Sequence, residues 1–294
     1  MDNDDLPIGR VLDRREALRL MAAASAAALV GCSRGSAAAV DSTSTVALSS
    51  TTAASNATAL PGCVVRPELT EGPYFVDNQL NRSDIRTDPA SGAAKPGTPL
   101  ALEFNVSQIS NGQCVPLKGA MVDVWHCDAN GVYAGVADTA VGFNTVGQKF
   151  LRGHQITDDK GVARFTTIYP GWYQGRAVHI HFKIRAPWAP GAKVTDATTQ
   201  YDFTSQLFFD DAQNNKVFAT APYSSKGLPD RKNQDDGIFR ESKGSLLVKL
   251  AQADQGYAGR FDVGLDLSDV SIGGTNGGGM GGPGGPPPPR QKKG

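Results

Sequence analysis

Short apolar segments separated by turn-forming clusters run through the centre of this chain and restrict it to a β-rich fold. The segments are rich in Val, Ile, Phe and Thr, which favour strands. They cover residues 100–109, 120–126, 150–157, 163–168, 179–184, 205–209, 246–250 and 260–265. Asp-Ala-Asn-Gly at 128–131 and Asp-Asp-Lys-Gly at 158–161 are strong turn signals. Helical periodicity is scarce. We therefore expect an all-β fold, mainly an antiparallel β-sandwich with long loops and little helix.

The N-terminal segment, residues 1–32, has the features of an export signal. Arg14 and Arg15 precede a mildly apolar run at 20–30, which is too short to span a bilayer. Paired arginines before such a run resemble a twin-arginine signal. The run ends at Cys32, as in a bacterial lipoprotein processing site, although an ordinary cleaved signal is the alternative. The sequence predicts a secreted protein or a cell-envelope lipoprotein tethered through Cys32.

Two further segments are too biased in composition to build a core. Residues 33–60 are almost entirely Ser, Ala, Thr and Val, and we expect a flexible linker there. Residues 273–294 are rich in Gly and Pro, which predicts a disordered tail. The remaining 61–272 are long enough to form one domain with a sizeable core.

Charge and cysteine content exclude several classes of protein. The chain has 29 basic and 29 acidic residues, so no excess positive charge favours nucleic acid or an anionic membrane. Besides Cys32, the cysteines are Cys63, Cys114 and Cys127. These three allow at most one internal disulfide, and the sequence does not choose the pair. None has the paired spacing of a zinc site.

A His-x-His pair lies in one predicted strand. Side chains two residues apart on a strand share a face, so His179 and His181 project together while Ile180 and Phe182 face the core. At a rise of about 3.3 Å per residue the two imidazoles lie roughly 7 Å apart along the strand and can converge on one metal. His-x-His alone also fits two surface histidines. However, the chain has only 4 histidines, and two of them are here.

Nearby tyrosines narrow the choice of metal. A phenolate is a hard, anionic oxygen donor that favours a highly charged ion, and a bound cation can keep it deprotonated. Two phenolates with two imidazoles would hold Fe(III) and disfavour Fe(II). No Asp or Glu lies within 169–184 to complete the two-histidine, one-carboxylate set of Fe(II) oxygenases.

The segment 169–184 resembles the signature of the intradiol ring-cleavage dioxygenases, the family of catechol and protocatechuate dioxygenases. That signature has Pro-x-x-Tyr, then Arg, then His-Ile-His-Phe. Here 170–173, Arg176 and 179–182 fit it.

Three other segments resemble the same family, in the same order along the chain. Residues 70–75 resemble its Glu-Gly-Pro-Tyr element. Residues 120–133 fit a strand ending in Val-Asp/Glu-x-Trp-His, a turn with Gly, and then the first tyrosine ligand. Residues 204–209 resemble its Thr-x-Gln-x-Tyr/Phe-Phe strand. The resemblance covers about 61–215.

The resemblance implies a non-haem Fe(III) centre. Tyr133 would be a permanent phenolate ligand, and Tyr173 would be the axial phenolate that leaves when catechol binds. His179 and His181 would be permanent imidazole ligands. The implied substrates are a catechol-type compound and O2, and the implied product is a cis,cis-muconate-type dicarboxylate.

Two further residues take implied roles in the reaction. Arg176 would stabilise the anionic form of the bound substrate, as oxyanion-stabilising groups do. Gln206 would support the ligands or border the O2 pocket. His126 is expected to be structural or to support a ligand, and His154 is expected to be structural.

The chain also departs from the family pattern. Only 5 residues separate Tyr173 from His179, fewer than in the cytoplasmic enzymes. The sequence is most similar to the secreted, single-domain branch, and it leaves the catechol substrate and the oligomeric state open. An exported, non-catalytic β-sandwich binding module related to these enzymes is the alternative function. A zinc hydrolase is disfavoured because it would not use the two tyrosines.

Overall fold

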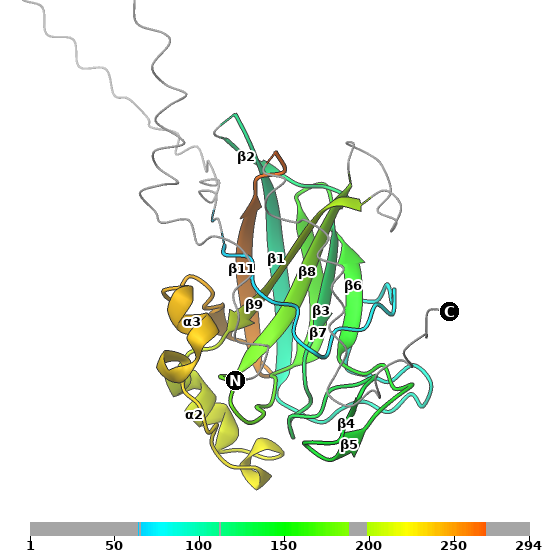
Figure 1. Cartoon of the computed structure of the whole chain (residues 1–294), viewed down its shortest axis with the longest axis vertical. Helices are drawn as coiled ribbons and strands as arrows, with labels where there is room; N and C mark the ends of the chain where they lie inside the picture. The colour runs from blue at the N-terminus through cyan, green and yellow to red at the C-terminus, as the bar shows by residue number, and fades with distance from the viewer. Residues whose placement is uncertain (1–63, 65, 112, 188–198, 269–294) are drawn as a thin grey trace, which may run out of the picture. The chain divides into compact units, whose positions relative to one another are not determined.

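The computed structural model describes residues 64, 66–111, 113–187 and 199–268, which belong to one compact unit (Figure 1). The predicted signal, linker and tail (1–32, 33–60 and 273–294) lie outside the described residues and stay predictions. No helix in the described part of the chain combines the length and the apolar character needed to cross a bilayer.

The larger sheet has five strands built around the long strand β1. Its strands are β1 (Pro99–Ser110), β2 (Gln113–Pro116), β7 (Val162–Ile168), β10 (Lys249–Gln252) and β11 (Tyr257–Leu265). The order is β10-β11-β1-β2, and β7 also pairs with β1. The β1–β11 pairing is parallel and the others are antiparallel. A parallel pair needs a long crossover, and almost the whole domain separates β1 from β11 in sequence.

The second sheet is entirely antiparallel and carries the His-x-His strand. It contains β3 (Met121–Trp125), β6 (Arg152–Ile156), β8 (His179–Pro187) and β9 (Thr199–Phe208), in the order β6-β3-β8-β9. A small hairpin of β4 (Ala137–Asp138) and β5 (Phe143–Asn144) lies apart from both sheets in Figure 1.

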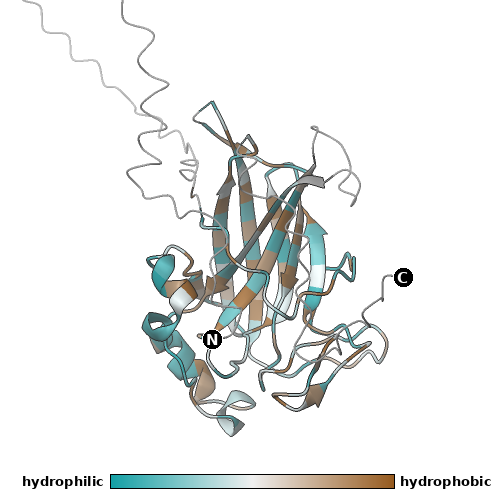
Figure 2. Ribbon diagram, viewed as in Figure 1, coloured by the Kyte–Doolittle hydropathy of each residue, from teal (hydrophilic) through white to brown (hydrophobic). Residues whose placement is uncertain are grey.

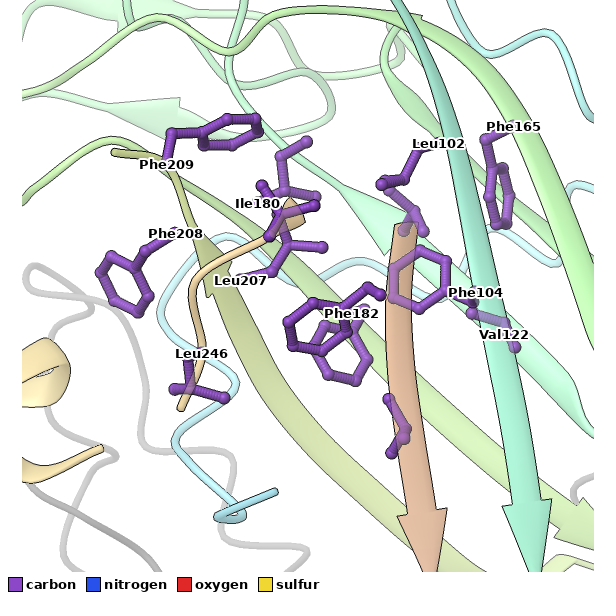
Figure 3. Packing of buried hydrophobic residues seen from close by; sticks show 14 of the residues in the cluster. Leu102, Phe104, Val122, Phe165, Ile180, Phe182, Leu207, Phe208, Phe209 and Leu246 are labelled. Atoms are coloured by element: carbon purple, nitrogen blue, oxygen red, sulfur yellow. The ribbon is translucent and has the colours of Figure 1, made fainter. Parts of the chain in front are cut away.

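The apolar core lies between the two sheets. Phe182 of β8 contacts Phe104 of β1 at a ring-centroid distance of 5.1 Å (Figure 3). It also contacts Phe261 of β11 at 5.4 Å. Ile180 and Ile184 belong to the same buried cluster. Figure 2 shows the alternation of hydrophobic and hydrophilic residues along these strands that such packing requires. The all-β sandwich is thus confirmed.

Helix is confined to a few short elements after β9. These are α2 (Asp211–Phe218), η2 (Tyr223–Ser225), η3 (Asn233–Asp235) and α3 (Gly237–Glu241). Asp210 and Asp236 cap α2 and α3 by accepting hydrogen bonds from first-turn amides. The expectation of little helix is confirmed.

Strand boundaries and cysteine chemistry refine the sequence predictions. Each of the eight predicted strands overlaps an observed one, but the predicted 246–250 shares only its last two residues with β10.

Cys114 is in a disulfide, whereas Cys127 is a buried free thiol. Cys32 and Cys63 lie outside the described residues.

Candidate active site

The predicted site residues lie on the face of the second sheet that is turned away from the apolar core. His181 of β8 pairs across the sheet with Trp125 of β3 and Gln206 of β9. All three are buried, with at most 1 % of their surface exposed. Period-two alternation therefore places Ile180 and Phe182 in the core and His179 and His181 on the opposite, also buried, face.

The two histidines turn their Nε2 atoms toward each other. The His179 Nε2 to His181 Nε2 distance is 3.0 Å, and the Tyr173 hydroxyl lies 3.3 Å from His179 Nε2. His179 Nδ1 lies 2.6 Å from the Ala177 carbonyl oxygen and donates to it. That bond fixes the tautomer and leaves a lone pair on His179 Nε2, the arrangement common in metal-binding histidines.

Burial keeps both imidazoles neutral. Desolvation, followed by the charge of Arg176, lowers the pKa of His179 to about 3. Desolvation and the neighbouring His179 lower the pKa of His181 well below its usual value. In its Nε2–H tautomer a neutral His181 donates to His179 Nε2, and in its Nδ1–H tautomer both Nε2 lone pairs face each other. In the second tautomer the pair is suited to bind a metal ion.

Tyr133 completes the group of four predicted ligands. Its ring centroid lies 5.7 Å from that of Tyr173 and 6.2 Å from that of His181. Tyr133 is buried, with 1 % of its surface exposed, whereas Tyr173 is partly exposed. The structure thus brings together all four side chains, from β8 and from the loops after β3 and β7.

Two glycines let the loops that carry the tyrosines pack backbone against backbone. Gly131 has a φ of +82°, and a Cβ there would overlap the Trp172 carbonyl oxygen. A Cβ on Gly171 would overlap the Asp128 carbonyl oxygen. Only glycine tolerates so close an approach. These contacts set the separation between Tyr133 and Tyr173.

Lys226 joins the same two loops. Its ammonium group donates to the Asn130 carbonyl oxygen at 2.7 Å and to the Trp172 carbonyl oxygen at 2.6 Å. It also lies 4.5 Å from the centroid of the Trp172 ring. Lys226 could not be selected from its local sequence, because its partners are distant along the chain.

Comparison with known proteins places this arrangement in a family. A sequence model of the family described as Dioxygenase matches residues 70–222, slightly more than half of the chain. The chain belongs to the intradiol ring-cleavage dioxygenase family. The resemblance deduced from the four motifs is confirmed.

Individual relatives of this chain are distant. It is 27% identical to a chlorocatechol 1,2-dioxygenase of Pseudomonas putida over 178 residues, which is 53% of this chain and 62% of the relative. It is 30% identical to a chlorocatechol 1,2-dioxygenase of Pseudomonas sp. (strain P51) over 107 residues, 30% of this chain and 38% of the relative. The chain therefore spans less than two thirds of these curated relatives.

One solved structure is matched by this chain over nearly all of its own length. The intradiol ring-cleavage dioxygenase from Tetranychus urticae is similar with a TM-score of 0.56 and 27% identity, covering 69% of this chain and 95% of that one.

Arg176 and Gln206 form a buried hydrogen-bond network next to His179 and His181. Arg176 donates through Nη2 to Gln206 Oε1 at 2.6 Å and through Nε to Asp236 Oδ2 at 2.9 Å. Asp236 Oδ2 also accepts from the Ala177 amide at 3.0 Å. Burial raises the pKa of Asp236, but Arg176 and the Ala177 amide outweigh it and the pKa is lowered. Sequence reasoning missed Asp236, whose only local signal is that of a helix cap.

The remaining histidines of the chain, His126 and His154, lie outside this group. His126 uses both ring nitrogens within the protein, with Thr167 Oγ1 at 2.7 Å and the Cys127 carbonyl oxygen at 2.9 Å. His154 lies 4.0 Å from Asp123. In the described part of the chain, no cluster of three or more His, Cys, Asp or Glu residues is placed to hold a metal.

Proposed function

We propose that this chain holds one non-haem Fe(III) ion through Tyr133, Tyr173, His179 and His181 and opens a catechol-type ring with O2. Cleavage between the two hydroxylated carbons would give a cis,cis-muconate-type dicarboxylate. The observation that supports this most directly is the convergence of two neutral imidazole Nε2 atoms, 3.0 Å apart, with two tyrosine side chains. Phenolate oxygens make this donor set suit a trivalent iron.

Each ligand has a distinct part in the proposal. Ferric iron, when bound, would supply the Lewis acidity that withdraws electron density from a bound catecholate and opens a ring carbon to O2. Tyr133 is buried and stays in place. Tyr173 is the partly exposed member of the four, so its phenol oxygen is the one placed to accept a catechol proton as the substrate enters.

The polar groups behind the histidines support the anionic substrate. Arg176 is held at two points, by Asp236 and by Gln206, so its guanidinium is fixed before the reaction begins. A preorganised cation contributes to the stabilisation of an oxyanion without reorganising during the step. We therefore assign Arg176 to electrostatic stabilisation and Gln206 and Asp236 to its orientation.

Colour and oxygen uptake together test this proposal. Protein loaded with ferric iron should be red-brown from tyrosinate-to-iron charge transfer, should consume O2 with catechol, and should release a ring-opened dicarboxylate detectable by mass spectrometry. Tyr173→Phe should shift the band and slow the uptake. Tyr257→Phe, on β11, is the matched control. Colourless iron-treated protein would contradict the metal site, whereas coloured protein without O2 uptake would favour the non-catalytic binding module.

We also propose that the dioxygenase works outside the cytoplasm. The paired arginines Arg14 and Arg15 and the position of Cys32 motivate this, and the disulfide at Cys114 suits an oxidising compartment. Cell fractionation tests it. Wild-type protein should be found in the membrane fraction of the envelope, and Cys32→Ser should release it; cytoplasmic protein in both cases would contradict export.

A further inference from the structure

Tyr74 links the two candidate tyrosine ligands to a carboxylate. Its ring stacks on Tyr133 at a centroid distance of 4.5 Å and meets Tyr173 edge-on at 5.8 Å. Its hydroxyl group donates to Asp138 Oδ2 at 2.6 Å. Tyr74 therefore contacts both tyrosines of the proposed centre with its ring and Asp138 with its hydroxyl group.

The exposure of these side chains indicates the side from which a substrate arrives. Tyr133, His179 and His181 have 1 %, 2 % and 0 % of their surface exposed. Tyr173 and Tyr74 are only partly buried. A planar substrate that reaches the four side chains must therefore enter past Tyr173, with Tyr74 as its aromatic neighbour.

Asp138 is held firmly and stays charged. Its Oδ1 accepts from the backbone amides of Ala140 at 2.9 Å and Val141 at 3.0 Å. Burial raises the pKa of Asp138, but the hydrogen bonds from Tyr74 and these amides outweigh it, and the pKa is lowered. The carboxylate is thus ionised at neutral pH and has a fixed position.

The cationic side chains near the proposed site already have partners of their own. Arg176 pairs with the buried Asp236. Lys226 is bound to backbone carbonyls and to the ring of Trp172. Arg152, which contacts Tyr74, donates to the carbonyl oxygens of Tyr74 at 2.6 Å and Ala134 at 2.5 Å. The pKa shift of Asp138 arises from burial and hydrogen bonds, and no cationic side chain of the described residues is among its causes. A substrate substituent that reaches toward Tyr74 therefore meets negative charge.

We propose that Asp138, positioned by Tyr74, selects the substrate by charge, so that catechols with a neutral or cationic substituent are preferred over catechols that carry a carboxylate. This inference rests on the proposed function, since it concerns which catechol that site accepts. Asp138 acts here as a specificity-determining residue and takes no part in bond cleavage.

Three probe compounds and two variants test this role. The probes are catechol, 3,4-dihydroxybenzoate, which carries a carboxylate, and dopamine, which carries an ammonium group. Asp138→Asn removes the charge, keeps one oxygen to accept from the Ala140 and Val141 amides, and places an NH2 group that can donate to the Tyr74 hydroxyl. Asp159→Asn removes an equal charge at a site that is 81 % exposed, and is the matched control.

We expect wild-type kcat/KM to be higher for dopamine and catechol than for 3,4-dihydroxybenzoate. Asp138→Asn should raise the 3,4-dihydroxybenzoate-to-dopamine ratio by about tenfold, as expected for one unit charge a few ångströms away in a partly solvated site. Asp159→Asn should not change it. In wild-type protein the preference should weaken as salt rises from ~0.05 to ~0.5 M, because screening reduces the interaction.

Anaerobic calorimetry with iron-loaded protein separates this inference from the proposed function. Binding of the three probes is then measured without ring cleavage, and the same charge preference should be seen. If the probes bind with this preference but no ring is opened under O2, the proposed function fails and the charge selection stands. If Asp138→Asn leaves the ratio unchanged, or if wild-type binding ignores charge and salt, the role of Asp138 is overturned.

Discussion

Strand β8 has two buried faces that are stabilised in different ways. One face, with Ile180 and Phe182, packs into the apolar cluster between the sheets. The other, with His179, His181 and Lys183, is also buried, yet its polar atoms make hydrogen bonds and ion pairs. The rings of Trp125 and Phe75 pack against this face. Apolar packing is non-directional and tolerates small shifts, whereas the polar face depends on the placement of individual atoms. The first face should therefore govern stability, and the second should govern function.

The largest effect on stability should come from the core face. Phe182→Ala removes a fully buried ring that contacts Phe104 and Phe261, and we expect it to lower the free energy of unfolding by about 3–5 kcal/mol. Phe143→Ala, in the small hairpin where the ring is partly exposed, is the control and should cost about 1 kcal/mol. Urea denaturation measures both. Equal losses of unfolding free energy in the two variants would contradict the view that the apolar core governs stability.

The polar face should stabilise the protein when iron binds to it. If the proposed site holds Fe(III), iron at a hundred times its dissociation constant should stabilise wild-type protein by about 2.7 kcal/mol. His181→Ala should abolish this gain, because it removes one of the two converging Nε2 atoms. His154→Ala, a buried histidine outside the group, should keep it. Thermal unfolding with iron and with a chelator measures the difference.

Much of the core face and part of the polar face could be predicted from the sequence. Alternation along 179–184 located both faces of β8, and the motifs located Tyr133 and Tyr173. The parallel pairing of β1 with β11 could not be predicted, because periodicity reports which face is buried and says nothing of the partner strand.

Long-range partners in the polar face were missed for a related reason. Asp236 lies 59 residues from its partner Ala177, and Lys226 lies 96 residues from Asn130. Each looks like an ordinary helix cap or surface lysine in its own segment. Only the folded chain shows that they hold Arg176 and the two tyrosine loops in place.

Backbone contact between the tyrosine loops offers a smaller perturbation. Gly131→Ala places a Cβ against the Trp172 carbonyl oxygen at a residue with φ of +82°, and we expect a loss of about 2 kcal/mol. Gly119→Ala is a close control, because its φ is +83° but nothing lies within 4 Å of the added atom. It should cost about 1 kcal/mol. The tyrosinate band of the iron-loaded protein should shift in Gly131→Ala alone; an unshifted band would mean that this contact does not set the separation of the tyrosines.

The smallest effect concerns a charge on the polar face of the same sheet. Asp123 on β3 is buried, and desolvation raises its pKa to about 7 although Arg185 opposes this. The folded protein therefore binds a proton more tightly than the unfolded chain, so this residue's contribution to stability is present at low pH and is lost as pH rises toward 7.

Asp123→Asn, which mimics the protonated form, should therefore stabilise the protein at pH 8 by about 1–2 kcal/mol and have little effect at pH 4. Asp266→Asn, at a partly exposed aspartate just after β11, is the control. Urea denaturation across this pH range measures the slope. A variant that is less stable than wild type at pH 8 would show that the ion pair of Asp123 with Arg185, at 3.9 Å, outweighs desolvation. The polar face would then be stabilised by its charges as well as positioned by them, and the contrast with the core face would narrow.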